Sequence, residues 1–174
     1  MNHFQNLIES SSMTMEKPEK SILMKNTGLE EGQDKKVLLD CQVPSRLEEI
    51  EKLADAVNQV LPDPDLAFAA NLCLEELISN TILHGLNGAD DQFIHVQISI
   101  SNEWLEILLR DNAPQFDPFM QAPKPNLSLD INERPIGGLG VHMVKTLMDV
   151  AHASYDGTGN WIVLRKSLHP RTTN

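Results

Sequence analysis

The clearest pattern in the chain is an alternation of apolar and polar residues over residues 94–100, followed by the turn Ser101-Asn102 and a second, less regular alternation with Leu105, Ile107 and Leu109 apolar. A period of two residues is typical of a strand with one buried face, because successive side chains point to opposite faces of a sheet. We therefore predict an antiparallel hairpin. Shorter apolar runs predict further strands near residues 37–39, 150–155 and 161–165.

Two segments before the hairpin have the period of a helix. Ser45 followed three residues later by Glu48 forms a capping-box pattern, and apolar residues then recur at helical spacing. A proline-containing break follows. Asp65 is expected to cap a second helix, which runs to about His84 or Leu86.

The order of elements predicts an α/β two-layer sandwich, with a mostly antiparallel mixed sheet and helices on one face. A glycine-rich turn at residues 137–140 opens a third, short helix, and several prolines mark a long loop over residues 112–136. Residues 1–34 are expected to be a flexible N-terminal extension, residues 35–168 the domain, and residues 169–174 a tail.

Composition narrows the class of protein. The chain has 174 residues and a formal net charge of −11, which argues against nucleic-acid binding, because such binding depends on basic residues that neutralise phosphates. The sequence has neither the long apolar run of a membrane span nor the pattern of a secretion signal. Cys41 and Cys73 lie in apolar segments and are expected to be core residues of a cytoplasmic protein.

One polar stripe on the second predicted helix is a candidate for chemistry. Glu76, Asn80 and His84 are four residues apart and share a side of the helix, at the border of its apolar face. Half-buried polar groups need partners, since leaving one unpaired costs about 1–3 kcal/mol. Structural water, neighbouring backbone or a ligand could each satisfy them.

Two further features are candidates for ligand binding. Asp111 stands where an alternating strand gives way to the long loop, a position suited to accepting a hydrogen bond from an amine or simply to forming a turn. The Gly137-Gly138-Leu139-Gly140 turn precedes a helix, and backbone N–H groups at a helix N-terminus favour phosphate. Loops also need glycine for purely structural reasons.

Taken together and in this order, the segments EELISNTILHG, DNAPQFDP and GGLGVHMVKTLMD resemble the GHKL ATPases, which share the Bergerat-type ATP-binding fold. Within that superfamily they are most similar to the RsbW-like anti-sigma factor serine/threonine kinases. The resemblance covers roughly residues 37–167.

The resemblance implies roles for residues at the matching positions. Glu76 would be the general base that takes the proton of the attacking hydroxyl. Asn80 would hold the Mg²⁺ that bridges the phosphates of ATP. Asp111 would accept a hydrogen bond from the adenine amino group, and Asn160 would lie near the adenine. Residues 114–136 would form a lid over the nucleotide.

Other implied roles are less direct. The backbone of Gly137, Gly138, Leu139 and Gly140 would wrap the phosphates. Arg134 would contact the nucleotide from the lid, although the family places its arginine nearer the glycine turn. Ala113 replaces the glycine that the superfamily usually has two residues after its adenine-binding aspartate. His84 would have a packing or supporting role. Lys124 and Lys145 are lesser candidates for the phosphates.

The function implied is that of an ATP- and Mg²⁺-dependent serine/threonine kinase that regulates a sigma factor. Its substrate would be a STAS-type anti-anti-sigma protein, and it would also bind the sigma factor, with homodimer formation possible. Three alternatives stay open. The chain could be an ATP-binding partner-switching module without transfer activity, a histidine-kinase catalytic domain separated from its dimerisation helices, or a structural α/β domain.

Overall fold

The computed structural model describes residues 34–121 and 139–169. The predicted flexible extension therefore lies outside the described residues, apart from Asp34, as does the tail apart from His169. Most of the predicted lid and three site candidates, Arg134, Gly137 and Gly138, lie outside them too. The boundaries of the domain stay a prediction.

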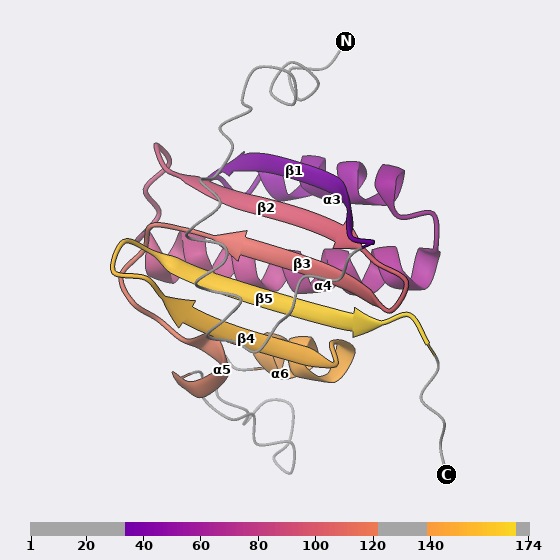
Figure 1. Cartoon of the computed structure of the whole chain (residues 1–174). Helices are drawn as coiled ribbons and strands as arrows, with labels where there is room; N and C mark the ends of the chain where they lie inside the picture. Colours follow the sequence, from indigo (N-terminus) through magenta and orange to yellow (C-terminus); the bar gives the residue numbers. More distant parts are fainter. Residues whose placement is uncertain (1–33, 122–138, 170–174) are drawn as a thin grey trace, which may run out of the picture.

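Five strands form one sheet, in the order β1-β2-β3-β5-β4 (Figure 1). Their bounds are β1 Lys36–Pro44, β2 Phe93–Ile100, β3 Trp104–Arg110, β4 Val150–Tyr155 and β5 Asn160–Ser167. The predicted hairpin is confirmed, because β2 and β3 pair with Ile98 opposite Ile107. All four pairings among these strands are antiparallel, so the sheet is purely antiparallel where a mostly antiparallel mixed sheet was predicted.

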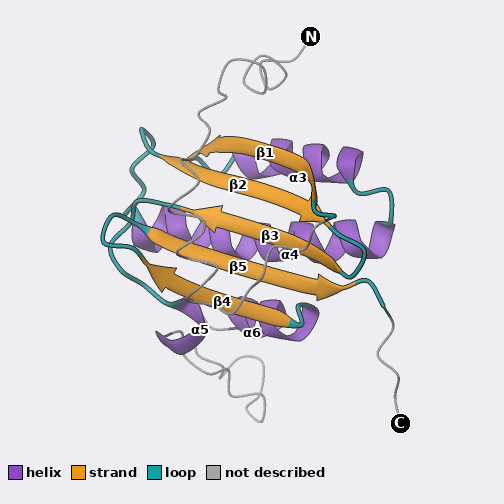
Figure 2. Ribbon diagram, viewed as in Figure 1, coloured by secondary structure: helices purple, strands orange, loops and turns teal. Residues whose placement is uncertain are grey.

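Three helices, α3 Glu49–Val60, α4 Pro64–Asn80 and α6 Leu139–Leu147, cover one face of the sheet (Figure 2). The predicted two-layer architecture is confirmed. The second predicted helix reaches Gly85 as expected, but its last turn, η1 Thr81–Gly85, is a π-helix. A one-turn helix, α5 Pro118–Gln121, lies within the segment predicted to be loop.

The core lies between the sheet and these helices. Its largest fully buried aliphatic side chains come from both layers: Leu53, Leu74, Leu77, Ile78, Ile94, Ile98, Ile107 and Leu164. Burying a side chain of this size stabilises the fold by about 1.5–3 kcal/mol. Cys41 and Cys73 are buried and free, as expected, and burial raises the pKa of each thiol to about 12.

The segment Pro64–Gly85 is long and apolar enough to cross a membrane by those two measures alone, with a mean hydropathy of 1.3 in its most apolar window. Seven side chains of α4 are buried, among them Ala70, Cys73 and Leu77, and belong to the core beneath the sheet. The burial of these side chains in the core accounts for the apolar composition of this segment.

Both predicted helix caps are wrong. The Ser45 hydroxyl donates to the Ala89 carbonyl at 2.6 Å and accepts from the Gln92 N–H at 3.2 Å, so it ties two loops together and caps no helix. Helix α3 begins at Glu49 without a side-chain cap. Helix α4 is capped by Asp63, whose Oδ1 accepts from the N–H groups of residues 65 and 66. The cap therefore lies two residues upstream of Asp65, and the helix begins at Pro64, which fits the first helical position.

Candidate functional site

The end of α4 brings Glu76 and Asn80 into direct contact. Asn80 Nδ2 donates to Glu76 Oε1 at 2.6 Å, and both residues are half-buried. The spacing of four residues places them one turn apart on the same side of the helix, as predicted. Since the amide donates to the carboxylate, its oxygen faces elsewhere and is open to a ligand.

The first turn of α6 closes over the Glu76 carboxylate. A Cβ added at Gly140 would lie 1.9 Å from the carboxyl carbon of Glu76 and 1.9 Å from its Oε2. Glycine is therefore required at this position by close approach. The N-terminal end of a helix favours negative charge, so this turn suits a carboxylate or a phosphate.

Asp111 follows the last residue of β3 and is held from several sides. Its N–H donates to the Asn160 carbonyl at 3.1 Å, which extends the β3–β5 pairing by one residue. Its Oδ1 accepts from the Ala113 N–H and from Asn160 Nδ2, each at 2.9 Å. Its Oδ2 has one long contact, 3.5 Å, from the Thr81 hydroxyl. Oδ2 is thus the oxygen left to accept from a ligand.

Asn160 is the first residue of β5 and donates to Asp111, while its nearness to adenine stays a prediction. Its polar atoms are already used within the protein. Nδ2 also donates to the carbonyls of Ala113, at 3.3 Å, and Pro114, at 3.1 Å. Oδ1 accepts from the Phe116 N–H at 2.9 Å. Asn160 therefore supports Asp111 and the start of the following loop.

Ala113 fits its place without strain. Among non-glycine residues of the described chain only Asn87 has positive φ, so Ala113 does not need the backbone freedom of glycine. Its Cβ faces Gly85, where an added Cβ would lie only 3.0 Å away. Ala113 is larger than the glycine that the superfamily usually has at this position, and Gly85 opposite it leaves space for the extra methyl group.

Thr81 joins the two groups of site residues, and the sequence analysis missed it. It directly follows Asn80, and the π-helical turn directs its hydroxyl toward Asp111. A π-turn inside a longer helix is frequent at functional sites. Apolar periodicity gives no signal for such a turn, but the position of Thr81 inside the EELISNTILHG segment could have marked it.

The other candidates differ in where they lie. Leu139 and Gly140 are the first residues of α6, next to Glu76, and Leu139 is exposed. Lys145 donates to the Phe119 carbonyl at 2.6 Å and so braces α5 against α6. His84 is exposed, which does not fit a packing role. Lys124 lies outside the described residues.

The donor set suits a magnesium ion only in part. Within the described ranges there is no group of three or more His, Cys, Asp or Glu side chains that could hold a metal. The amide oxygen of Asn80 is a hard ligand, and Mg²⁺ commonly takes only one or two protein oxygens and completes its shell with water and phosphate. The site therefore fits a magnesium ion that arrives with a nucleotide.

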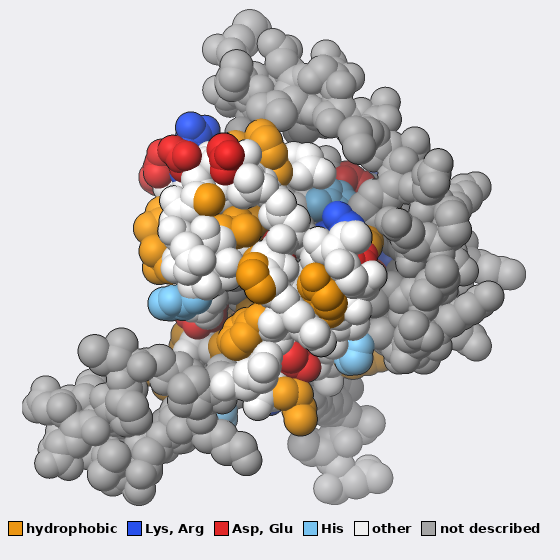
Figure 3. Space-filling model, turned by 90° about the vertical axis from the view of Figure 1, so that its left-hand side faces the viewer, with side chains coloured by type: hydrophobic (Ala, Val, Ile, Leu, Met, Phe, Trp, Pro, Cys, Tyr) orange, Lys and Arg blue, Asp and Glu red, His pale blue; other side chains and the backbone are white. Residues whose placement is uncertain are grey.

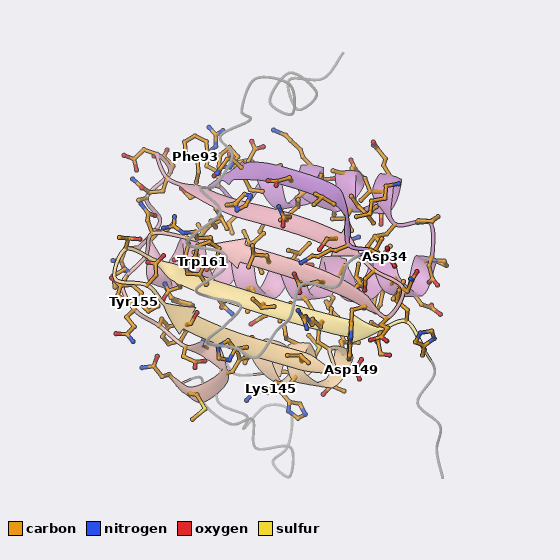
Figure 4. All side chains as sticks on the ribbon, in the orientation of Figure 1. Asp34, Phe93, Lys145, Asp149, Tyr155 and Trp161 are labelled. Atoms are coloured by element: carbon orange, nitrogen blue, oxygen red, sulfur yellow. The ribbon has the colours of Figure 1, made fainter. Side chains whose placement is uncertain are left out.

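Large apolar side chains are exposed around this end of the molecule. Leu83 lies in η1, Phe93 opens β2, Phe116 follows Asp111 and Tyr155 ends β4. Phe93, Tyr155 and Trp161 lie toward the same end of the sheet (Figure 4). Seen end-on, hydrophobic side chains are spread across much of this surface, and Asp and Glu side chains gather mainly near one margin (Figure 3).

Residues 43–166 match the family of the histidine kinase-like ATPase domain. The chain belongs to this family. The Glu76–Asn80 pair, the Asp111–Asn160 pair and the α6 turn lie within the matched region, so the ATP-binding architecture expected from the sequence resemblance is confirmed at the level of the family.

Two groups of relatives are similar to the chain over most of this domain. The serine-protein kinase RsbW of Listeria monocytogenes is 30% identical over 105 residues, covering 58% of this chain and 65% of the relative. The chain thus spans just under two thirds of that relative. The anti-sigma F factor of Clostridium beijerinckii is 24% identical over 139 residues, covering 78% of this chain and 96% of the relative.

Among solved structures, a Mycobacterium tuberculosis protein with RsbU and RsbW domains has a TM-score of 0.51 and 14% identity to this chain. The similarity covers 74% of this chain and 31% of the other. It supports the fold.

Proposed function

We propose that this protein is an ATP-dependent serine/threonine kinase that acts as an anti-sigma factor and phosphorylates a STAS-type anti-anti-sigma protein. The observation that carries the proposal is the continuous site along the end of α4. Glu76 and Asn80 lie beside the α6 turn, and Thr81 links them to Asp111. The similarity to an RsbW kinase and to an anti-sigma F factor supports the same function.

Each end of the site has a separate task in nucleotide binding. At one end, Oδ2 of the buried Asp111 accepts a hydrogen bond from the amino group of adenine. At the other end, the α6 turn lies where its N–H groups can bind phosphate oxygens. Asn80 would hold a Mg²⁺ ion, which neutralises phosphate charge when bound. Neutralisation matters in a chain whose formal net charge is −11.

In the transfer step, a serine or threonine oxygen of the partner attacks the γ-phosphorus of ATP. The bond between that phosphorus and the β,γ-bridging oxygen breaks, and ADP leaves. Glu76 takes the hydroxyl proton of the acceptor, a contribution of about 10²–10⁴ to the rate. Most of the remaining acceleration comes from positioning and charge.

The partner would dock at the site end, where the apolar side chains of Leu83, Phe93 and Phe116 are exposed. Such side chains are suited to a protein interface. The sigma factor is proposed as a second partner by analogy with the anti-sigma F factor relative. Two buried, free cysteines are compatible with the cytoplasm, the compartment we propose.

The alternative is an ATP-binding partner-switching module without transfer activity. One observation favours it: the Glu76 carboxylate is held by Asn80 at 2.6 Å and covered by Gly140, so it must move to reach a hydroxyl. A transfer assay separates the two functions.

The assay mixes the purified chain with γ-phosphate-labelled ATP, Mg²⁺ and STAS-domain proteins from the same cells. The kinase proposal predicts label on a serine or threonine of one STAS protein. Glu76→Gln should lower that transfer at least about 100-fold while leaving ATP binding nearly intact. Glu75→Gln, on the exposed side of the same helix, is the matched control. ATP binding without label on any STAS protein would favour the switching module.

A further inference from the structure

The Asn160 side chain makes four hydrogen bonds inside the protein and is 4% exposed. Its Nδ2 donates to Asp111 Oδ1 and to the carbonyls of Ala113 and Pro114, while its Oδ1 accepts from the Phe116 N–H. Turning the amide over would place its oxygen against three acceptors and its nitrogen against a donor. The orientation of Asn160 is therefore fixed by the network.

This fixed amide divides the two oxygens of Asp111, which is itself 7% exposed. Oδ1 accepts from two N–H groups, those of Asn160 and Ala113, each at 2.9 Å. Among the described residues, Oδ2 has only the 3.5 Å contact from Thr81, a distance at which a hydrogen bond is weak. One atom of residue 111 is thus bound to the protein, and the other is available to a base.

We propose that Asn160 is a positioning residue that fixes the orientation of residue 111, so that one side-chain atom of residue 111 is bound within the protein and the other faces the nucleobase. The proposal rests on the nucleotide site described above. Asn160 acts through Asp111 and makes no contact with the base.

Nucleotide binding by wild type does not reveal this role, because either oxygen of the Asp111 carboxylate can accept a hydrogen bond from the base. Asp111 selects the 6-amino group of adenine in either orientation. Asp111→Asn makes the two positions different. The donors of Asn160 and Ala113 hold the amide oxygen at the Oδ1 position, so the NH₂ group must take the Oδ2 position. The variant then offers a donor to the base, which suits the 6-oxo group of hypoxanthine.

The experiment titrates the full-length protein with ATP and with ITP, each with Mg²⁺, by calorimetry. Four proteins are compared: wild type, Asp111→Asn, Asn160→Leu and the double variant. We expect wild type to prefer ATP by about tenfold or more, the scale of one hydrogen bond to a charged group. Asp111→Asn should prefer ITP by a similar factor. The double variant should prefer ITP less strongly than Asp111→Asn does, because only the Ala113 N–H, at 2.9 Å, still holds the amide oxygen at the Oδ1 position.

Asn160→Thr keeps one donor for Oδ1 and tests the same point if Asn160→Leu fails to fold. Combined with Asp111→Asn, it should retain a preference for ITP. A purely structural role for Asn160 predicts a different result in the Asp111→Asn background, where the added Asn160 substitution would weaken ATP and ITP binding equally and leave their ratio unchanged.

Three results would overturn the inference. A folded Asp111→Asn protein that still prefers ATP, or that binds neither nucleotide, would show that Asn160 does not fix the orientation of residue 111. A double variant with the same preference as Asp111→Asn would show that another group does so. If wild type binds neither nucleotide, the proposed function fails as well, and the same titration identifies that case.

Discussion

At the residue scale, the site depends on side chains that touch one another in pairs. Glu76 contacts Asn80, Asp111 contacts Asn160, and Gly140 leaves the space that the Glu76 carboxylate occupies. Because the contacts are close, a change of one or two atoms has a defined geometric effect.

Gly140→Ala tests the close approach of α6 to α4. The added Cβ would lie 1.9 Å from the Glu76 carboxyl carbon, so the carboxylate or the helix must shift. We expect a loss of about 1–3 kcal/mol in the free energy of unfolding, measured by urea denaturation, together with weaker ATP binding. Combining Gly140→Ala with Glu76→Ala should recover most of the lost stability, because the clashing group is gone. An unchanged stability of Gly140→Ala alone would contradict the contact.

At the element scale, the sequence predicted the strands, the hairpin and the position of the second helix, because their apolar periods are regular. It failed at the starts of the two helices. Ser45 and Glu48 have the capping-box spacing, yet the Ser45 hydroxyl bonds to the loop at residues 89–92, a contact between residues 44 positions apart in the chain. Local pattern cannot anticipate such a tertiary bond. The π-turn after Asn80 was missed for a related reason, since the Thr81 hydroxyl contacts Asp111, which follows β3 and lies 30 positions away in the chain.

The same limit applies to the candidate site. Glu76 and Asn80 were expected to be neighbours, because helical spacing fixes their separation. The contact of Asp111 with Asn160 could not be derived from spacing, because it depends on the register between β3 and β5. The family resemblance placed Asn160 near the adenine, but only the structure shows that its amide is used by Asp111 and by the backbone of residues 113–116.

Asp63→Ala tests the corrected start of α4. Asp63 Oδ1 accepts from two N–H groups of the first turn, at 2.9 and 3.1 Å. Losing this cap should lower the free energy of unfolding by about 1 kcal/mol. Asp65→Ala, two residues later, should cost no more than about 0.3 kcal/mol through the helix dipole. Chemical denaturation of both variants measures the difference. A larger loss of unfolding free energy for Asp65→Ala than for Asp63→Ala would show that Asp65, and not Asp63, caps the helix.

An ion cluster on the helix-free face of the sheet predicts a pH dependence. Glu106 on β3 contacts Arg165 on β5 at 2.7 Å and also Lys35. Burial alone would raise the pKa of Glu106, but hydrogen bonds and the charges of Lys35 and Arg165 outweigh it and hold the pKa below its usual value of 4.5. A lowered folded-state pKa adds stability above the unfolded-state pKa, and this stability is lost as the pH falls.

Glu106→Gln should therefore reduce the acid sensitivity of the protein. Urea denaturation at pH 6 and at values below 4.5 should show a smaller fall in unfolding free energy for the variant than for wild type. Glu103→Gln, an exposed carboxylate in the turn before β3, controls for the loss of one charge. If the unfolding free energies of wild type and Glu106→Gln fell equally with pH, Glu106 would not contribute to the acid sensitivity of the protein.

At the scale of the whole molecule, the net charge of the protein opposes the binding of an anionic nucleotide. The protein is acidic, with a formal net charge of −11, so an anionic nucleotide must be held by local features. Asp111 follows β3 at one end of the sheet, and α4 carries Glu76 and Asn80 to the turn where α6 begins. Exposed apolar side chains around the same end leave room for a protein partner.

The most direct test of the central claim is calorimetric titration of wild type and Asp111→Ala with ATP, with and without Mg²⁺. The account predicts that wild type binds ATP more tightly with Mg²⁺. It also predicts that Asp111→Ala loses about 1.5–3 kcal/mol of binding free energy, the scale of a hydrogen bond to a charged group. Wild type that fails to bind millimolar ATP, or a folded Asp111→Ala protein of unchanged affinity, would contradict the nucleotide site described here.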